Sequence, residues 1–440
     1  MIRAFIFLNH FYMDINHIHS LFLKCSGVSI DTRKIEKESL FVAIKGERFD
    51  ANTFAAEALA KGASYVIIDD KSYYIDWRTI LVEDSLVALQ ELAKFHRNYL
   101  KLPIVALTGS NGKTTTKELI NVVLAKKYRT KATVGNLNNH IGVPLTLLSF
   151  DVNTEMGIVE MGANHKKEIE FLCEIAQPDY GYITNFGKAH LEGFGGVQGV
   201  IEGKSEMYQY LSKNDKLAFI NLEDPIQLEK SKALKHYSFG INKDEADVSV
   251  AKIEANPFVS VFYSDVEIKT QLIGLYNANN VNAALTIGEF FNVEKEAIKA
   301  ALESYVPENN RSQLLNKAGN EIILDAYNAN PSSMAVAITN FLQLEKPNKI
   351  MILGDMFELG DESHTEHMAL VDSLKKEENV ECYFVGKAFN ECQIAKNNFH
   401  FYESFDSFSE GLKNINFENN TILIKGSRGM ALERTLEFIK

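Results

Sequence analysis

The residues best suited to chemistry lie together at positions 108–115, which read Thr-Gly-Ser-Asn-Gly-Lys-Thr-Thr. Two glycines let the backbone curl so that successive N–H groups face an anion, and the N-terminus of a following helix adds partial positive charge. A lysine at this place suits the β- and γ-phosphates of a nucleotide, and one of the following threonine hydroxyls suits its Mg²⁺. The predicted nucleotide-binding residues are Thr108, Gly109, Ser110, Asn111, Gly112, Lys113, Thr114 and Thr115.

The sequence on both sides of this loop favours nucleotide binding over a simpler alternative. An apolar run at 104–107 is typical of a strand buried in a parallel sheet, and apolar pairs such as Leu119 with Val123 indicate a helix after the loop. The full phosphate-loop pattern has glycine where Leu107 stands, and Gly-Lys-Thr can also be a turn that caps a helix. Because strand, glycines, lysine, hydroxyls and helix follow in order, we favour a nucleotide site.

The elements that must position this loop alternate between strands and helices. At roughly 150 residues per domain, 440 residues suggest about three domains. We predict an α/β protein with a small domain at 1–100, a central parallel-sheet domain at 101–306 that carries the loop, and a Rossmann-like domain at 307–440. Alternating residues at 251–273 suggest an antiparallel insertion. Buried strands are expected at 104–107, 157–159, 180–184, 217–220, 322–324, 350–353 and 421–424.

Composition and charge exclude several classes of protein. The 46 Lys and Arg residues against 58 Asp and Glu give a net charge of −12, which argues against a broad nucleic-acid-binding surface. No apolar run approaches the roughly 18 residues of a membrane span. The four cysteines have no metal-ligand spacing, so we expect reduced thiols and a cytoplasmic location. We also expect a monomer, and we interpret residues 1–12, which precede Met13, as a start-site extension.

Further segments extend the pattern along the chain. They are Asp-Thr-Arg at 31–33, Leu-Phe-Val-Ala-Ile-Lys-Gly-Glu-Arg-Phe-Asp at 40–50, Gly-Asn-Leu-Asn-Asn-His-Ile-Gly-Val-Pro at 135–144, Val-Glu-Met-Gly-Ala-Asn at 159–164, Glu-Gly-Lys-Ser-Glu-Met at 202–207, Arg-Ser-Gln at 311–313, Asp-Ala-Tyr-Asn-Ala-Asn-Pro at 325–331 and Leu-Gly-Asp-Met-Phe-Glu-Leu-Gly at 353–360. In order and spacing, these segments and the loop resemble the Mur ligases of peptidoglycan synthesis, and within them the MurF branch.

The resemblance implies an ATP-dependent ligase that joins D-alanyl-D-alanine to UDP-N-acetylmuramoyl-tripeptide. A carboxylate is a poor electrophile because its leaving group would be oxide, so ATP first converts it to an acyl phosphate. The amine of the dipeptide then attacks, and phosphate leaves. Such a reaction depends on positioning three substrates together and on cations that hold the triphosphate beside the carboxylate.

The same resemblance implies two Mg²⁺ ions and their ligands. Glu160 follows a buried strand, so its carboxylate would emerge near the loop, with an exposed surface carboxylate as the alternative. His190 resembles a ligand of the second ion, and Lys204 resembles a lysine that CO₂ carbamylates to N6-carboxylysine. Without the resemblance, His190 would be a loop residue and Lys204 a solvated lysine. The implied metal ligands are Thr114, Glu160, His190 and Lys204 as its carbamate.

Other catalytic and ATP-binding roles also follow from the resemblance. Asn277 and Asn280 match an adenine-binding stretch in which Tyr276 replaces the usual histidine, and helix capping is the alternative for these amides. Arg311 corresponds to a residue that reaches the γ-phosphate, and Asp325 would orient ATP or its Mg²⁺. The implied catalytic residues are Lys113, His190, Lys204 and Arg311.

The remaining implied residues bind the two other substrates. The residues for the UDP-sugar-peptide lie in the first domain and in the Asn-rich segment of the central domain, and those for the dipeptide lie in the last domain. For the UDP-sugar-peptide they are Thr32, Arg33, Lys45, Asn136, Asn138 and Asn139, and for the dipeptide they are Asn328, Asn330, Asp355, Met356 and Glu358.

Two other functions stay open at this point. Another ATP-dependent amide ligase, such as a different Mur ligase or a folate polyglutamate synthase, would share the loop and the metal residues. A non-catalytic nucleotide-binding regulator would not need metal ligands together with Arg311. A GTPase-like switch has no support, because Asn-Lys-Asp at 242–244 does not match the guanine-reading Asn-Lys-x-Asp pattern.

Overall fold

The computed structural model describes residues 14–308, 310–412, 415 and 417–439, so the start-site extension predicted at 1–12 lies outside the described residues. The chain divides into two compact units. One contains the described residues up to Leu107 together with Tyr128–Gly162 and Glu168–Gly181. The other contains Thr108–Lys127, Ala163–Lys167 and the described residues from Tyr182 onward. The architecture is α/β with mainly parallel sheets, as predicted.

The N-terminal part of the first unit is built on a four-stranded parallel sheet in the order β1-β2-β5-β6. Helix α3 begins after Asp84, whose carboxylate accepts a hydrogen bond from the N–H of Val87, and ends at Lys101 in a left-handed conformation (φ 52°). The elements are α1 (Ile15–Phe22), β1 (Val28–Ser29), η1 (Thr32–Lys34), β2 (Leu40–Val42), the hairpin strands β3 (Lys45–Gly46) and β4 (Phe49–Asp50), η2 (Ala51–Phe54), α2 (Ala55–Ala60), β5 (Tyr65–Ile68), η3 (Lys71–Tyr73), β6 (Thr79–Leu81) and α3 (Ser85–Leu100).

A nine-stranded sheet carries the phosphate loop, in the order β15-β14-β13-β12-β11-β10-β7-β9-β8. Strand β7 pairs in parallel with β9, and all five of its residues are buried, as expected inside a parallel sheet. Strands β13, β14 and β15 are antiparallel, which agrees with the insertion predicted at 251–273. The strands are β7 (Ile104–Thr108), β8 (Thr130–Ala132), β9 (Met156–Glu160), β10 (Tyr180–Ile183), β11 (Leu217–Asn221), β12 (Lys235–Ile241), β13 (Val248–Ala255), β14 (Phe258–Tyr263) and β15 (Val266–Ile273).

The helices between these strands differ in burial, since α4 buries one apolar face and α10 is buried at nearly every residue from Ala278 to Gly288. Helix α4 starts after Gly112, which has a φ of 78°, and buries Leu119, Ile120, Val123 and Leu124. None of the helices in the described ranges has both the length and the apolar character that a membrane span requires. The helices are α4 (Lys113–Leu124), α5 (Gly142–Leu148), α6 (Glu168–Ala176), α7 (Leu191–Phe194), α8 (Val197–Lys213), α9 (Pro225–Lys230), η4 (Leu275–Asn277), α10 (Ala278–Phe290) and α11 (Lys295–Ser304).

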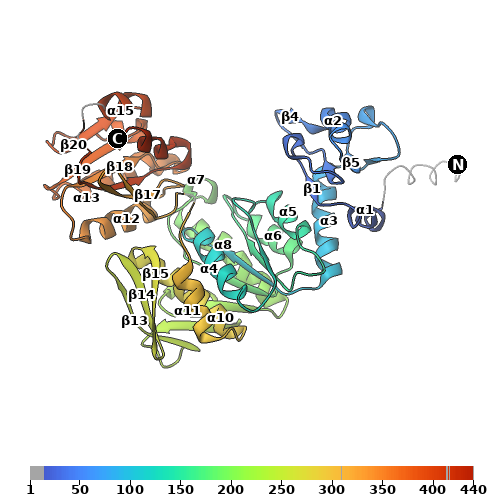
Figure 1. Ribbon diagram of the computed structural model, residues 1–440, viewed down its shortest axis with the longest axis horizontal. Coiled ribbons are helices and arrows are strands. Elements are labelled where there is room, and N and C mark those ends of the chain that lie inside the picture. Colours follow the sequence, from blue (N-terminus) through green and yellow to red (C-terminus); the bar gives the residue numbers. More distant parts are fainter. Residues whose placement is uncertain (1–13, 309, 413–414, 416, 440) are drawn as a thin grey trace. The chain divides into compact units, whose positions relative to one another are not determined.

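The C-terminal part of the second unit, orange to red in Figure 1, holds a six-stranded sheet in the order β16-β17-β21-β18-β19-β20. Only β16 runs antiparallel to its neighbour. The apolar strands predicted at 322–324, 350–353 and 421–424 are β17, β18 and β21, at the centre of this sheet. The elements are β16 (Gln313–Lys317), β17 (Asn320–Asp325), α12 (Pro331–Gln343), β18 (Lys349–Gly354), η5 (Gly360–Glu362), α13 (Ser363–Ser373), β19 (Val380–Val385), α14 (Lys387–Asn390), β20 (Phe399–Tyr402), α15 (Phe405–Leu412), β21 (Thr421–Lys425), η6 (Arg428–Met430) and η7 (Leu432–Glu437).

Candidate active site

The phosphate loop depends on two glycines that no other residue could replace without strain. Gly109 has a φ of 144°, and a Cβ atom there would lie 2.0 Å from Oγ1 of Thr184. Gly112 has a φ of 78°, and its Cβ would lie 2.7 Å from Oδ1 of Asn280. The close approach of neighbouring side chains and the left-handed backbone both require glycine. The predicted turn between β7 and α4 is therefore present, with its backbone packed tightly against its surroundings.

Residues 184–187 hold the middle of this loop in place. The N–H of Ser110 donates to the carbonyl of Asn185 (3.0 Å), and the N–H of Asn111 donates to Oδ1 of the same residue (3.1 Å). Oγ1 of Thr184 donates to the carbonyl of Asn111 (2.6 Å), and Oγ of Ser110 donates to the carbonyl of Gly187 (2.7 Å). Thr184 and Asn185 thus fix the loop from the end of the adjacent strand β10.

Lys113 and the amide side chains of the predicted adenine-binding stretch, Asn277 and Asn280, lie beside this loop. Nζ of Lys113 donates to the carbonyls of Gly109 (2.7 Å) and Ser110 (3.3 Å). Oγ1 of Thr116 donates to Oδ1 of Asn280 (3.0 Å), whose Nδ2 donates to Oδ1 of Asn277 (2.8 Å). Asn277 and Asn280 are buried, so in this structure they join α10 to the helix that follows the phosphate loop.

Glu160 belongs to the first unit, at the end of β9. It is 1% exposed and pairs in register with Leu107, the residue before the loop. Nδ2 of Asn138 donates to Oε1 of Glu160 (2.8 Å), and the N–H of Glu160 donates to Oγ1 of Thr133 (3.0 Å). Asn138, which we predicted to contact the UDP-sugar-peptide, therefore orients the predicted metal carboxylate.

His190 and Glu358, predicted for different substrates, lie together in the second unit. Nδ1 of His190 is in direct contact with Oε2 of Glu358, and this contact lowers the pKa of the Glu358 carboxyl. The N–H of Glu192 also donates to the carbonyl of Glu358 (3.4 Å). A residue predicted to bind the second Mg²⁺ and a residue predicted to bind the dipeptide are thus neighbours.

Lys204 is wholly buried on α8. Its Nζ lies 5.1 Å from the centre of the Phe194 ring, and a Cβ at the preceding Gly203 would lie 2.5 Å from that same ring. The aromatic face is the kind of surface that attracts a cation. Nowhere in the part of the chain that the structure describes do three His, Cys, Asp or Glu side chains gather as a metal site. Within the described residues, His, Cys, Asp and Glu side chains alone therefore do not form a metal site.

Asp325 is held by the chain itself. Lys425, which is 2% exposed, donates from Nζ to Oδ2 of Asp325 (2.6 Å) and to the carbonyl of Asn328 (3.3 Å). The N–H of Ser312 donates to Oδ1 of Asp325 (3.2 Å). Both carboxylate oxygens therefore have partners within the protein, and Lys425 is a functional candidate that the sequence analysis missed.

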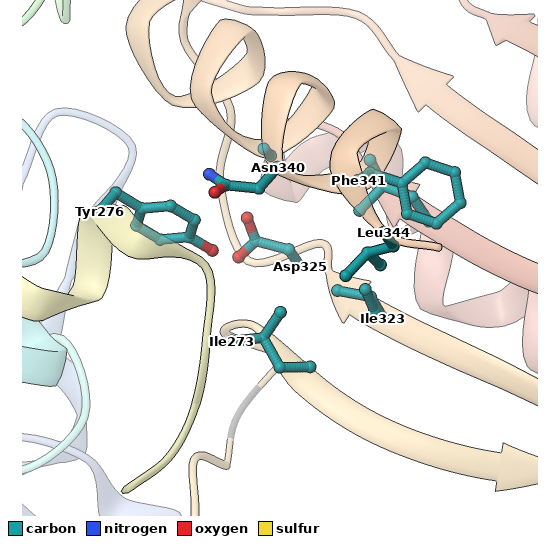
Figure 2. Close-up of a pocket in the computed structure, with 9 residues that line it drawn as sticks. Ile273, Tyr276, Ile323, Asp325, Asn340, Phe341 and Leu344 are labelled. Carbon is teal, nitrogen blue, oxygen red and sulfur yellow. The ribbon is translucent and has the colours of Figure 1, made fainter. Parts of the chain in front are cut away.

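Tyr276 closes a small pocket beside Asp325, and Figure 2 shows its hydroxyl directed toward that carboxylate. The hydroxyl bonds to Oγ of Ser312 (2.6 Å), and burial, together with the charge of Asp325, raises the pKa of Tyr276. The pocket leaves about 10 Å³ for the centre of a water molecule, which is room for about one water. It is too small for a purine. Its other lining residues are Ile273, Ile323, Ala337, Asn340, Phe341, Leu344 and Leu423.

Two arginines lie against Tyr327, which follows β17. The guanidinium carbon of Arg311 is 3.5 Å from the ring centre, and that of Arg428 is 5.0 Å from it. Nη1 of Arg428 also donates to the Tyr327 hydroxyl (3.0 Å). Arg311 was predicted, whereas Arg428 was not, although it follows the predicted strand at 421–424 by only a few residues.

The residues predicted for the dipeptide divide into two groups. Asp355 accepts hydrogen bonds from the N–H groups of Ala388 and Phe389 (both 3.0 Å), and so it caps α14. Asn330 caps α12 through the N–H of Ser333 (2.9 Å). Asp355, Asn330 and Met356 are buried and form the first group, which supports the loops. Asn328 and Glu358 are exposed and form the second group, which a ligand can reach.

The residues predicted for the UDP-sugar-peptide lie in the first unit and are mostly exposed. Arg33 pairs with Asp31 (2.7 Å), and its hydrogen bond lowers the pKa of Asp31 to about 2. Lys45 faces Asp50 at 3.7 Å in the β3–β4 hairpin. Asn139 accepts from the N–H of Gly142 (2.9 Å) at the start of α5. Thr32 is partly buried and Asn136 is exposed.

Comparison with known proteins identifies the family. Three family models match the chain: the Mur ligase family catalytic domain at 24–97, the Mur ligase middle domain at 107–288 and the Mur ligase glutamate ligase domain at 310–428. The UDP-N-acetylmuramoyl-tripeptide–D-alanyl-D-alanine ligase of Bacillus subtilis is 36% identical over 93% of this chain and 92% of its own. The chain belongs to the Mur ligase family.

Solved structures agree with this assignment and place the chain in the MurF branch. MurF from Acinetobacter baumannii superposes with a TM-score of 0.82 at 32% identity, covering 93% of this chain and 92% of that one. The MurF ligase from Thermotoga maritima in complex with ADP also gives 0.82, at 27% identity, covering 95% and 97%. The predicted resemblance and the three-domain α/β fold class of this Mur ligase are thereby confirmed.

Proposed function

We propose that this Mur ligase uses ATP to join D-alanyl-D-alanine to UDP-N-acetylmuramoyl-tripeptide, giving UDP-N-acetylmuramoyl-pentapeptide, ADP and phosphate for cell-wall synthesis. The observation that carries the proposal is the loop at 108–113, whose glycines leave no room for a side chain, in a chain that matches such ligases along nearly its whole length. The sequence of steps is phosphorylation of the tripeptide carboxylate, attack by the dipeptide amine and loss of phosphate.

The phosphate loop binds and orients the nucleotide. Gly109 and Gly112 keep its backbone close to the phosphates, and the N-terminus of α4 favours negative charge there. Lys113 already lies over the loop, with its Nζ on two loop carbonyls, so a short movement brings the ammonium to a phosphate oxygen. Arg311 stabilises the transferring phosphoryl group with a planar guanidinium.

The metal ligands we propose are Thr114, Glu160, His190 and Lys204. Mg²⁺, when bound, neutralises the triphosphate and polarises the phosphoryl group. Glu160 fits such an ion because its buried carboxylate is a hard oxygen donor that Asn138 holds in one orientation. Lys204 fits only as N6-carboxylysine, because an ammonium cannot ligate a cation.

Substrate binding is divided among the three parts of the chain. We assign residues 1–100 to the UDP-sugar-peptide, 101–306 to ATP and 307–440 to the dipeptide, and we place the enzyme in the cytoplasm as a monomer. Asp325 positions the nucleotide through the Ser312–Tyr276 hydrogen bonds rather than as a free metal ligand. The exposed Asn328 and Glu358 receive the dipeptide.

Phosphate release measured with each substrate omitted in turn tests the proposal. We expect turnover only when ATP, UDP-N-acetylmuramoyl-tripeptide and D-alanyl-D-alanine are all present, with a mass increase of the sugar-peptide by one dipeptide. Turnover with a single amino acid in place of the dipeptide would move the function to another Mur-type or folate polyglutamate-type ligase. Nucleotide binding without turnover in any mixture would identify a regulator instead.

A further inference from the structure

Arg311 and Arg428 bring two positive charges to one aromatic ring. Their guanidinium carbons lie 3.5 Å and 5.0 Å from the centre of the Tyr327 ring. Within the described ranges neither guanidinium forms an ion pair with a carboxylate, and Nε of Arg311 is buried without a hydrogen-bond partner. Like charges held this close without anions repel each other. The arrangement therefore indicates places for two anionic groups beside one tyrosine ring.

The position of Arg428 relates it to the dipeptide residues. Strand β21 lies between β17 and β18, parallel to both, so the loops after the three strands meet at one edge of the sheet. These loops carry Asn328, Glu358 and Arg428, all of them exposed. Ligands of open α/β sheets bind at the carboxyl ends of the strands. Arg428 is an exposed cation at this edge.

The loop with Arg428 is fixed to the loop with Glu358. The N–H of Phe357 donates to Oγ of Ser427 (2.9 Å), and the N–H of Ser427 donates to the carbonyl of Asp355 (3.1 Å). A Cβ at Gly429 would lie 2.7 Å from the Phe357 ring, so the two loops are in close contact. An acidic and a basic side chain are thus presented from two loops that cannot move independently.

The dipeptide carries the two charges that this edge can pair. At neutral pH it has an ammonium at one end and a carboxylate at the other, and two residues span at most about 7 Å. Its amine must reach the acyl phosphate, where Arg311 binds in the proposed function, so its carboxylate lies about one dipeptide length away. Two guanidinium carbons that lie 3.5 Å and 5.0 Å from the same ring centre are no more than about 8.5 Å apart, so the two ends of one dipeptide can lie beside the two arginines.

We propose that Arg428 binds the terminal carboxylate of D-alanyl-D-alanine, with the Tyr327 hydroxyl holding its guanidinium in place. This inference rests on the proposed function and names a specificity residue for it. An arginine bound to a carboxylate makes two charge-assisted hydrogen bonds, and a dipeptide lacking that carboxylate would leave Arg428 unpaired. The rival source of an anion at Arg428 is a phosphate of ATP.

Steady-state kinetics with Arg428→Gln separates these sources. We expect KM for D-alanyl-D-alanine to rise about 10- to 100-fold, because a hydrogen bond to a charged group contributes about 1.5–3 kcal/mol. The KM values for ATP and for UDP-N-acetylmuramoyl-tripeptide should stay within about twofold. Arg428→Lys, which keeps the charge but not the fork of donors, should be intermediate. A rise in KM for ATP alone would assign Arg428 to a phosphate and overturn the proposal.

A second probe, the C-terminal amide of D-alanyl-D-alanine, makes the test independent of folding. The wild-type enzyme should have a lower KM for the dipeptide acid than for its amide, by about the factor by which Arg428→Gln raises KM for the acid. Arg428→Gln should use the acid and the amide about equally well. A merely structural role would lower both activities and leave their ratio unchanged, which would refute the proposal.

A matched control is Arg434→Gln. Arg434 is an exposed arginine of the same segment whose guanidinium stacks on Phe405 at 3.9 Å and donates to the carbonyls of Met430 and Ala431. Its loss should leave KM for the dipeptide within about twofold. Failure of the wild-type enzyme to use D-alanyl-D-alanine at all would reject the proposed function. An unchanged preference for the acid in Arg428→Gln would reject only the role of Arg428.

Discussion

The polar groups of the phosphate loop are bonded to other parts of the protein, whereas the carboxyl edge of the C-terminal sheet also presents exposed charged side chains. In the loop, Ser110 and Asn111 are held by Asn185, and Lys113 lies on the loop carbonyls. At the sheet edge, Glu358 and Arg428 are exposed, with His190 and Tyr327 as their side-chain neighbours.

In the proposed function, this difference follows from the ligand that each region binds. Triphosphate is the same in every turnover and is recognised through a rigid backbone, so preorganisation lowers the cost of binding it. The dipeptide edge presents charged side chains on loops that are fixed to one another, and its specificity comes from pairing those charges. Substitutions in the phosphate loop should therefore reduce turnover whichever substrate is limiting. Substitutions at the dipeptide edge should mainly raise KM for the dipeptide.

The largest effect is expected at Lys204 on α8, which, like Ser110 of the phosphate loop, is buried. Lys204→Ala should lower kcat by about 1,000-fold, because a group that stabilises charge in the reaction contributes about 10²–10³ in rate. A short carboxylic acid such as formate or acetate should partly restore the rate by replacing the carbamate. Phosphate release with increasing acid is the measurement. Lys213→Ala, an exposed lysine at the end of the same helix, is the control. Unimpaired Lys204→Ala would remove this residue from the mechanism.

Lys425→Met tests the buried ion pair behind the dipeptide edge. Removing one partner of a buried pair leaves the other charge uncompensated, so we expect about 3 kcal/mol lower stability in urea denaturation. Adding Asp325→Asn should recover part of this loss, because the remaining charge is then also gone. Lys346→Met, which breaks an exposed pair with Glu321 of the same sheet, should change stability by less than about 1 kcal/mol. Equal effects of the two lysines would contradict the buried pair.

Gly109→Ala tests the rigidity of the phosphate loop. A Cβ atom 2.0 Å from Oγ1 of Thr184 must displace the loop, and a displacement of about 1 Å at a reacting centre can reduce activity about 100-fold. Gly62→Ala is the matched control, since Gly62 also has a positive φ (106°) but its Cβ would meet Lys37 only at 3.6 Å. We expect KM for ATP to rise in Gly109→Ala and to stay unchanged in Gly62→Ala. Similar activity of the two variants would show that the loop tolerates a side chain.

The smallest effect is expected at a buried polar pair outside both regions. Nε2 of His19 and Nδ1 of His96 are 3.0 Å apart, and burial lowers the pKa of His19 from 6.5 to about 4. As pH falls below about 6.5, the unfolded chain takes up the proton first, so the free energy of unfolding decreases until about pH 4. Thermal unfolding between pH 7 and pH 4 measures this. His19→Phe should reduce the slope, and His17→Gln, on the exposed side of the same helix, should leave it unchanged.

The contiguous features of the fold and the site could be predicted from the sequence. The apolar runs at 104–107, 322–324, 350–353 and 421–424 became β7, β17, β18 and β21 because short runs of this kind are stable only when buried. The phosphate loop could be predicted because its chemistry and its geometry both reside in eight consecutive residues.

Contacts between distant segments could not be predicted in this way. Asp325 and Lys425 are 100 residues apart, and His190 and Glu358 are 168 apart, so nothing in either local sequence reports the other. Lys425 and Arg428 carried a weak signal, since both stand at the end of an apolar strand in an α/β domain, where ligands bind. Asn138 was assigned to a substrate because its sequence context does not reveal that its amide reaches Glu160.

One amide connects the nucleotide loop with the last part of the chain. Asn330 starts α12 with its Oδ1, and its Nδ2 donates to Oδ1 of Asn111 (2.7 Å). Next to it, Oγ of Ser332 accepts from the N–H of Lys188. Because the first turn of α12 is bonded to the loop that we propose binds phosphate, a fluorophore attached to the exposed side of this helix should report nucleotide binding by a change in its emission.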